Sequence, residues 1–250
     1  MDTNSAEEQP LIQHLLELRS RLLKSLLCVV ITFAALFVFA NDIYEFVAHP
    51  LQQFLPENST MIATDVASPF LTPFKLTLLV SMFLSMPYIL FQIWSFIAPA
   101  LYQNEKRLAL PLFVSSVILF YCGIAFAYYV VFPLAFQFFM SVAPDSVAAM
   151  PDMSSYLNFV LKIIFGFGVA FEVPVVTVML IAAGVTTTES LATKRPYVIV
   201  GCFVLGMFLT PPDVISQVLL ALPMWLLFEL GLFFGNFIVK KTPSEQQDAL

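Results

Sequence analysis

The sequence predicts an all-α membrane protein with six transmembrane helices in a single domain that spans residues 1–250. Of the 250 residues, 60% are hydrophobic and only 11% are charged, whereas a soluble domain has about 45–50% apolar and about 25% charged residues. The apolar residues gather in six segments, and the basic residues gather in the connections on one side of them. Since backbone groups in lipid must be satisfied within the segment, these segments are expected to be helices.

Four of the apolar segments are long enough to cross a bilayer, because a span needs about 20 residues to cover about 30 Å. The second contains Pro87, the third carries no charge, and the fourth contains Lys162, Glu172 and Pro174. These four predicted spans cover residues 22–40, 74–98, 111–132 and 156–183.

The last two segments are short, and a tight turn joins them. Residues 197–209 would form only about 20 Å of helix at about 1.5 Å per residue, and residues 214–228 are little longer. The Thr-Pro-Pro-Asp sequence at 210–213 ends one helix and suits the first turn of the next. We therefore expect a short helical hairpin that is either re-entrant or sits in a thinned bilayer. The alternative is a last helix that continues through Glu229 to Val239.

The basic residues predict the topology. Lys and Arg lie before the first span, between the second and third, between the fourth and fifth, and after the sixth, and the opposite connections (41–72, 133–155 and 210–213) have none. The positive-inside rule therefore places both termini in the cytoplasm, with a cytoplasmic amphipathic segment at 1–21 and a cytoplasmic tail at 242–250.

The segment before the first span has the apolar repeat of a helix, and Glu17 and Arg21 are four residues apart, so they can pair. It either anchors the first span at the interface, or presents Glu17 and Arg19 as part of a cytoplasmic docking face.

The connection "WSFIAPALYQNEKRLALP" (94–111) carries a carboxylate that topology does not explain, because acidic residues do little to orient spans. Glu105 follows the aromatic residues Phe96 and Tyr102. A carboxylate beside aromatic rings suits an arginine guanidinium, which takes two hydrogen bonds and stacks on aromatic faces. The alternative is an ion pair within the loop, between Glu105 and Lys106 or Arg107.

Glu172 falls in the middle of the fourth span, where ionisable residues are costly and usually face the bundle interior or water. It either bonds a neighbouring helix in a packing or conformational role, or acts as the coupling acid of a proton-coupled small-solute transporter. The second role lacks support, because no further acid or histidine lies mid-membrane to relay the proton.

The short hairpin gathers three polar residues, Thr210, Asp213 and Gln217, at its outer end. Asp213 can cap the last helix. The cluster either serves the turn alone or forms a polar notch that a partner helix could complete.

Several chemistries are not expected. The chain has no phosphate-binding loop and no metalloprotease motif, and its two histidines, His14 and His49, lie outside the span centres. The three cysteines are odd in number and widely spaced, which favours packed thiols. We expect no cofactor, no metal, no nucleic-acid partner and no enzymatic activity.

Seven stretches together resemble the TatC family, the large integral subunit of the twin-arginine protein translocase, over nearly the whole chain. They are "HLLELRSRLL", "HPL", "MIATDVASPF", "FQIWSFIAPALYQNEKR", "FEVPVV", "KRPYVIVGCFVLGMFLTPPD" and "LALPMWLLFELG".

The resemblance implies a receptor in the bacterial cytoplasmic (inner) membrane that exports folded proteins with the proton-motive force. It implies a cupped bundle whose fifth and sixth helices are short, in a multimeric complex with the single-span subunits TatA and TatB and with membrane lipid. Glu17, Arg19, Phe96 and Glu105 match the positions that bind paired arginines of signal peptides. Functional positions of the family match Pro50 and Glu172, and positions where TatA and TatB dock match Met207, Thr210 and Gln217.

Overall fold

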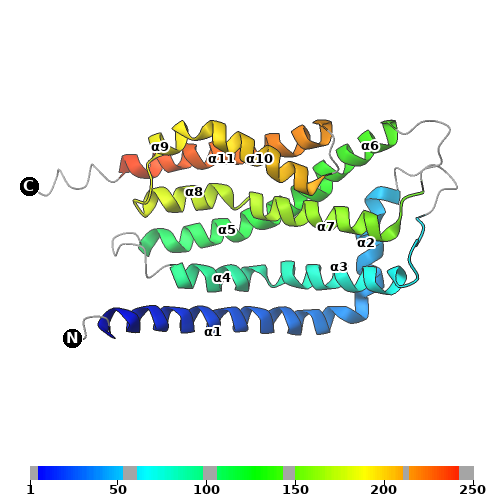
Figure 1. Cartoon of the computed structure of the whole chain (residues 1–250), viewed down its shortest axis with the longest axis horizontal. Helices are drawn as coiled ribbons and strands as arrows, with labels where there is room; N and C mark the ends of the chain where they lie inside the picture. The colour runs from blue at the N-terminus through cyan, green and yellow to red at the C-terminus, as the bar shows by residue number, and fades with distance from the viewer. Residues whose placement is uncertain (1–4, 53–60, 98–105, 143–149, 211–213, 242–250) are drawn as a thin grey trace, which may run out of the picture.

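The computed structural model describes residues 5–52, 61–97, 106–142, 150–210 and 214–241; for residues 5–13, 50–52, 106–108, 216 and 238–241 it describes the backbone only. Most of the described helices run side by side along one axis, whereas α2 lies across it (Figure 1). The only strand-like pairing among the described residues is one isolated bridge between Ile62 and Asp152. The all-α prediction is confirmed for this part of the chain. The helices are α1 (Ser5–Leu36), α2 (Ala40–Gln52), α3 (Ser68–Leu84), α4 (Met86–Ile97), α5 (Lys106–Phe126), α6 (Phe132–Val142), α7 (Met153–Ala170), α8 (Val173–Ala182), α9 (Thr188–Thr193), α10 (Arg195–Leu209) and α11 (Val214–Lys241), with a 3-10 turn η1 (Phe37–Phe39) and a π-helical turn η4 (Ala127–Val131).

The predicted spans map onto these helices with two breaks. Four stretches of the described residues are long and apolar enough to cross a membrane: His14–His49, Ala109–Val142, Met153–Ala182 and Gln217–Phe237. The second predicted span is α3 followed by α4, bent by 50°, and the fourth is α7 followed by α8, with Glu172 at the break. The count of six crossings and the side on which each end lies stay predictions.

The fifth helix is short, as expected, but the preferred end of the sixth is wrong. α10 has 15 residues, whereas α11 has 28 and continues through Glu229 to Lys241. Two glycines explain the continuation. A Cβ atom at Gly231 would lie 2.9 Å from the Cα atom of Pro174, and one at Gly235 would collide with Ile181, so α11 passes close against α8 here. This packing supports the helix beyond Glu229.

Two tyrosines of the third span compensate for prolines in the neighbouring helices. Pro87 has no N–H group for the carbonyl of Phe83, four residues earlier, and the Tyr121 hydroxyl donates to that oxygen at 3.1 Å. Pro50 likewise leaves the carbonyl of Phe46 without its helical donor, and the Tyr128 hydroxyl donates to it at 2.9 Å. The 50° bend and the end of α2 are therefore stabilised from outside their own helices.

We expect a Tyr128→Phe variant to loosen α2 from the third span, because the Phe46 carbonyl loses its donor. The cost is about 0.5–1.5 kcal/mol, that of one net hydrogen bond. Thermal unfolding of the purified chain checks this, with Tyr129→Phe as the control, because Tyr129 is 71% exposed. Equal melting temperatures for the two variants would contradict the role of Tyr128.

The core lies between α3, α5, α6 and α7. Phe120, Phe132 and Phe167 are fully buried, and the ring of Phe120 contacts that of Phe83 edge-on with centroids 5.8 Å apart. Such edge-to-face aromatic pairs add about 0.5–1.5 kcal/mol beyond the area they bury. This core fixes the positions of the helices whose ends carry the polar residues.

Asp152 joins two connections at one end of the bundle. Its Oδ2 atom accepts from the backbone N–H of Ser155 at 2.8 Å and so caps α7. Its Oδ1 atom accepts from the hydroxyl of Thr64 at 2.8 Å and from its N–H at 3.1 Å. These hydrogen bonds lower the pKa of the Asp152 carboxyl from 3.8 to about 2. The bond from the Ser155 N–H is the largest cause, and the bonds from Thr64 follow.

We expect Asp152→Asn to lower the thermal stability at neutral pH, because an amide places a donor against the Thr64 or Ser155 donors. The pKa is lower in the folded state, so the carboxylate stabilises the fold fully above about pH 4 and loses this effect as the pH falls towards 2. The difference in melting temperature between wild type and variant should therefore shrink between pH 4 and pH 2. Asp65→Asn, at an exposed neighbour, is the control; a pH-independent difference for Asp152→Asn would contradict the assignment.

The described helix ends gather at two opposite ends of the bundle. The start of α1, the end of α4, the start of α5, α9 and the end of α11 lie together at the left of Figure 1, and we call this the basic end. α2, the end of α6 and the start of α7 lie at the right, and the end of α10 and the start of α11 stop short of them (Figure 1).

Candidate functional site

At the basic end, an arginine ties α1 to α4. The guanidinium of Arg21 donates through Nη2 and Nε to Glu17 Oε1 at 2.6 and 3.0 Å. The same group donates through Nη1 to Gln92 Oε1 at 3.2 Å and through Nη2 to the Ser95 carbonyl at 3.3 Å. The predicted pairing of Glu17 with Arg21 is thus confirmed, and it extends to α4. Both hydrogen bonds to Glu17 fall on one oxygen, and the Glu17 side chain is 45% exposed.

Phe96 lies on the same pair of helices as Glu17. It is half-buried near the end of α4 and stacks on His14 of α1, with ring centroids 4.2 Å apart. The structure therefore brings Glu17 and Phe96, which are far apart in sequence, to one junction of α1 and α4. Arg19 is exposed on α1.

Two of the predicted site residues lie outside the described residues. Glu105 directly precedes the start of α5, and Asp213 directly precedes α11. The alternative ion pair of Glu105 with Lys106 or Arg107 and the predicted cap by Asp213 therefore stay predictions. The backbone of Pro50 lies in α2, near its end.

Glu172 occupies the break between α7 and α8. Its Oε2 atom accepts a hydrogen bond from the hydroxyl of Ser116 on α5, and Ser116 is buried. The other oxygen, Oε1, is buried and has no partner among the described residues. The carboxyl thus bonds a neighbouring helix, as the packing interpretation expects.

The polar residues of the α10–α11 hairpin are partly used within it. Gln217 Nε2 donates to the Phe203 carbonyl at 2.8 Å, across the two helices. The buried Thr210 donates to the Gly206 carbonyl at 2.9 Å. Met207 is 50% exposed, so of the three it is the side chain most open to a neighbouring molecule.

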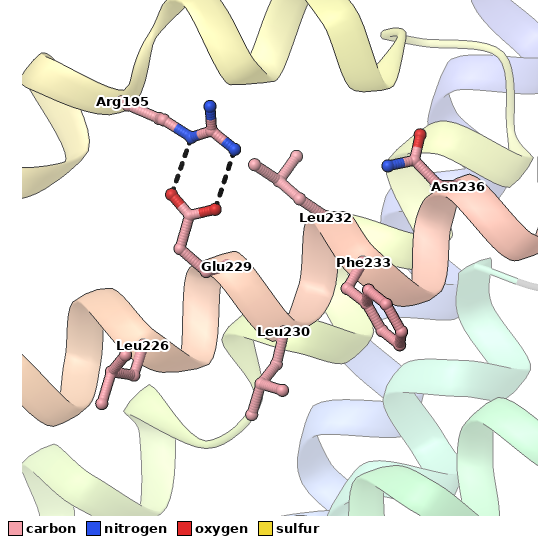
Figure 2. A pocket seen from close by; sticks show the side chains of 7 residues that line it. All are labelled: Arg195, Leu226, Glu229, Leu230, Leu232, Phe233 and Asn236. Atoms are coloured by element: carbon pink, nitrogen blue, oxygen red, sulfur yellow. Dashed lines mark hydrogen bonds and ion pairs between the residues drawn. The ribbon is translucent and has the colours of Figure 1, made fainter.

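Sequence reasoning missed the ion pair between Arg195 and Glu229. Arg195 at the start of α10 donates through Nε and Nη2 to the two oxygens of Glu229 on α11, at 2.7 and 2.9 Å (Figure 2). A usable signal was present, since both residues lie about four helical turns from the Thr-Pro-Pro-Asp turn. Antiparallel helices joined by a tight turn bring such positions together.

No cluster suited to a metal ion occurs among the described residues. Cys28, Cys122 and Cys202 are free thiols. Cys202 is buried, whereas Cys122 is exposed, so the expectation of packed thiols is wrong for Cys122. A cysteine in a lipid-facing position needs no packing partner, because its side chain is apolar enough for the surroundings.

The bundle, its long apolar helices and the polar junction at one end define a multi-span helical membrane protein. Residues 13–223 match the model of the family described as Sec-independent protein translocase protein (TatC), and the chain belongs to the TatC family. This is a family of protein translocase components rather than of enzymes, so the chain takes part in protein transport.

Relatives agree over nearly the full length. The Sec-independent protein translocase protein TatC of Azotobacter chroococcum is 64% identical over 232 residues, which cover 93% of this chain and 91% of that protein. The TatC of Escherichia coli K12 is 58% identical over 241 residues, which cover 96% and 93%. A crystal structure described as the twin arginine translocase receptor TatC has a TM-score of 0.81 at 41% identity and covers 90% of this chain and 98% of that one.

Proposed function

We propose that the chain is the signal-peptide receptor and core subunit of a twin-arginine translocase, which exports folded proteins across the bacterial cytoplasmic membrane using the proton-motive force. In this proposal both termini are cytoplasmic, so the basic end faces the cytoplasm. The paired arginines of a signal peptide bind Glu17 and Glu105, with Phe96 beside them. The family and the resemblance to a translocase receptor support the assignment.

The observation that carries the proposal is the way Arg21 binds Glu17. A guanidinium is already held against this carboxylate, which shows that the junction of α1 and α4 accommodates one. Both bonds use Oε1, and the side chain is 45% exposed, so an arriving arginine can bind at Oε2 or replace Arg21. Phe96 lies half-buried beside the junction and offers an aromatic surface. Glu105 precedes α5 and supplies the second carboxylate. Arg19 takes part in the same N-terminal face.

The apolar part of the signal peptide would lie in an apolar cleft of about 580 Å³ between α2, α3 and α5. Its walls are mainly aliphatic and aromatic, and they include Leu76, Val80 and Phe83. An apolar helix in such a groove is a common mode of peptide recognition. The hairpin would recruit TatB and TatA through Met207, Thr210 and Gln217 to form a multimeric complex, while Pro50, Glu172 and Asp213 hold the surrounding helices in place.

The test compares binding of two peptides, one with an Arg-Arg motif and one with Lys-Lys, to the purified chain. Wild type should prefer Arg-Arg, because lysine lacks the planar fork that binds a carboxylate twice. A charge-assisted hydrogen bond contributes about 1.5–3 kcal/mol when shielded and less when exposed, so Glu105→Ala and Glu17→Gln should each reduce Arg-Arg affinity about tenfold.

Glu189→Ala is the matched control, because Glu189 is an exposed acid at the same end of the bundle. Its Arg-Arg preference should equal that of wild type. An unchanged preference in both Glu105→Ala and Glu17→Gln would overturn the proposal. Crosslinking from position 105 to the arginine motif of a precursor in native membranes then shows whether the contact forms in the assembled translocase.

A further inference from the structure

The pair of Arg195 and Glu229 lies in an unusual place. Glu229 falls near the middle of the stretch Gln217–Phe237, which is long and apolar enough to cross a membrane. The pair is nevertheless open, because the Arg195 side chain is 49% exposed and that of Glu229 is 27% exposed. Ionisable groups at such positions are costly and normally face a bundle interior or water. Because the two charged side chains are exposed at this level, we expect a polar group of another molecule to contact them.

The pair also borders a cleft of about 590 Å³ (Figure 2). The cleft is walled by apolar side chains of α11 and contains one further polar residue, Asn236. Leu226, Leu230 and Phe233 are each about half exposed. One exposed charged pair beside half-exposed apolar side chains resembles the two parts of a phospholipid, a polar headgroup and acyl chains.

α10 and α11 indicate different levels for the membrane surface beside the ion pair. α10 begins at Arg195, and the exposed residues Lys194, Arg195 and Tyr197 around its start are typical of an interface. α11 continues past Glu229 for three more helical turns, mostly apolar, to Lys240. Headgroups can reach the ion pair beside α10 while acyl chains still cover the apolar face of α11. The structure thus places a headgroup-level group next to an acyl-level surface.

The bonding of the pair selects the headgroup. A guanidinium has five N–H groups, of which the two bonds to Glu229 use two. The remaining donors suit a phosphate. A phosphate alone would give the site a net negative charge, since Arg195 and Glu229 cancel each other. An ammonium group that donates to the free lone pairs of Glu229 or to Asn236 restores neutrality.

We propose that Arg195 and Glu229 form a binding site for an amine-bearing zwitterionic phospholipid, whose phosphate contacts Arg195 and whose ammonium contacts Glu229. The acyl chains lie against Leu226, Leu230 and Phe233. The site is separate from the junction of α1 and α4, and it does not depend on the signal-peptide proposal.

The test uses the full chain in detergent with three phospholipids of identical acyl chains: phosphatidylethanolamine, phosphatidylcholine and phosphatidylglycerol. Retained lipid is measured by native mass spectrometry. Phosphatidylethanolamine should bind about tenfold more tightly than phosphatidylcholine, whose trimethylated amine cannot donate hydrogen bonds. It should also exceed phosphatidylglycerol, which has no cation for Glu229.

Two variants separate the two contacts. Glu229→Gln should bring the ratio of phosphatidylethanolamine to phosphatidylcholine close to one while lipid is still retained, because Arg195 keeps the phosphate. Arg195→Gln should lower retention of all three lipids. A purely structural ion pair would lower the melting temperature in both variants without changing the lipid ratio.

Glu189→Gln, at an exposed acid on neighbouring α9, is the control and should keep the wild-type ratio. A wild-type ratio of about one, or a ratio that Glu229→Gln leaves unchanged, would overturn the proposal. Absence of retained lipid would also overturn it, and would favour a protein helix as the occupant of the cleft.

Discussion

A Gly123→Val variant is expected to lose the folded bundle. A Cβ atom at Gly123 on α5 would lie 2.6 Å from the backbone oxygen of Phe167 on α7 and 3.0 Å from the ring of Phe171. A backbone atom cannot move aside as the end of a side chain can, so α5 and α7 would have to separate. The cost should exceed the roughly 1–3 kcal/mol of ordinary overpacking.

The residues around Gly123 raise the free-energy cost of separating α5 from α7. Phe120 and Phe167 are fully buried on the same two helices, and a gap between the helices would remove contacts from both rings. Glu172 would move away from Ser116, which leaves the hydroxyl of this buried serine without its hydrogen-bond partner. The three losses act on one interface, so we expect little folded protein after purification.

The measurement is the yield of monodisperse protein in size-exclusion chromatography, followed by thermal unfolding of what is recovered. Gly201→Ala is the matched control, because a Cβ atom at Gly201 on α10 would have no heavy atom within 4 Å. That variant should be as stable as wild type or slightly more so, since alanine favours a helix over glycine. Normal yield and melting temperature for Gly123→Val would refute the close packing of α5 and α7.

The contrast between α10 and α11 shows what the sequence could and could not predict. The length of α10 follows from local signals, because basic residues precede it and Thr-Pro-Pro-Asp ends it. The end of α11 depends on Gly231 and Gly235, which let it pass close to α8. That contact joins segments far apart in the chain, and no local pattern carries it. A single charged residue, Glu229, therefore gave a misleading signal for a helix end.

In the candidate site, too, local contacts could be predicted from the sequence and long-range contacts could not. Glu17 was predicted to pair with Arg21 because they are four apart on one helix, and this spacing fixes the contact. The continuation of the network to Gln92 and Ser95 on α4 depends on how α1 and α4 pack. The roles of Tyr121 and Tyr128 were missed for the same reason. Each proline predicts a carbonyl without a helical donor four residues earlier, but the hydroxyl that donates to this carbonyl comes from a distant segment.

A Gly231→Val variant is expected to displace the α10–α11 hairpin and leave the rest of the bundle folded. A Cβ atom at Gly231 would lie 2.9 Å from both the Cα atom of Pro174 and the Cβ atom of Thr177 on α8. Valine adds two methyl groups beyond that atom, so α11 must move away from α8. Gly231→Ala should give a smaller effect in the same direction.

The hairpin should move as a unit, because its two helices are joined at two levels. Gln217 of α11 bonds the Phe203 carbonyl of α10 near the turn, and Arg195 and Glu229 join the helices at the other end of α10. The core cluster that contains Phe120 and Phe167 takes only Leu220 from α11 among its buried residues, so most of its contacts do not involve α11. We therefore expect the variant to be recovered as folded protein with a melting temperature lower by several degrees.

The measurement for Gly231→Val combines thermal unfolding with crosslinking from position 207 to a single-span partner subunit. If the hairpin docks these subunits, as proposed, displacement should reduce the crosslink strongly, even though residue 231 lies on α11 and Met207 lies on α10. Phe234→Ala is the control on the same helix, because Phe234 is 53% exposed and its loss leaves the α8 contact intact. An undiminished crosslink together with a lowered melting temperature would show that α10 keeps its position without α11. In that case the rigid pairing of the two helices would be wrong, and docking would depend on α10 alone.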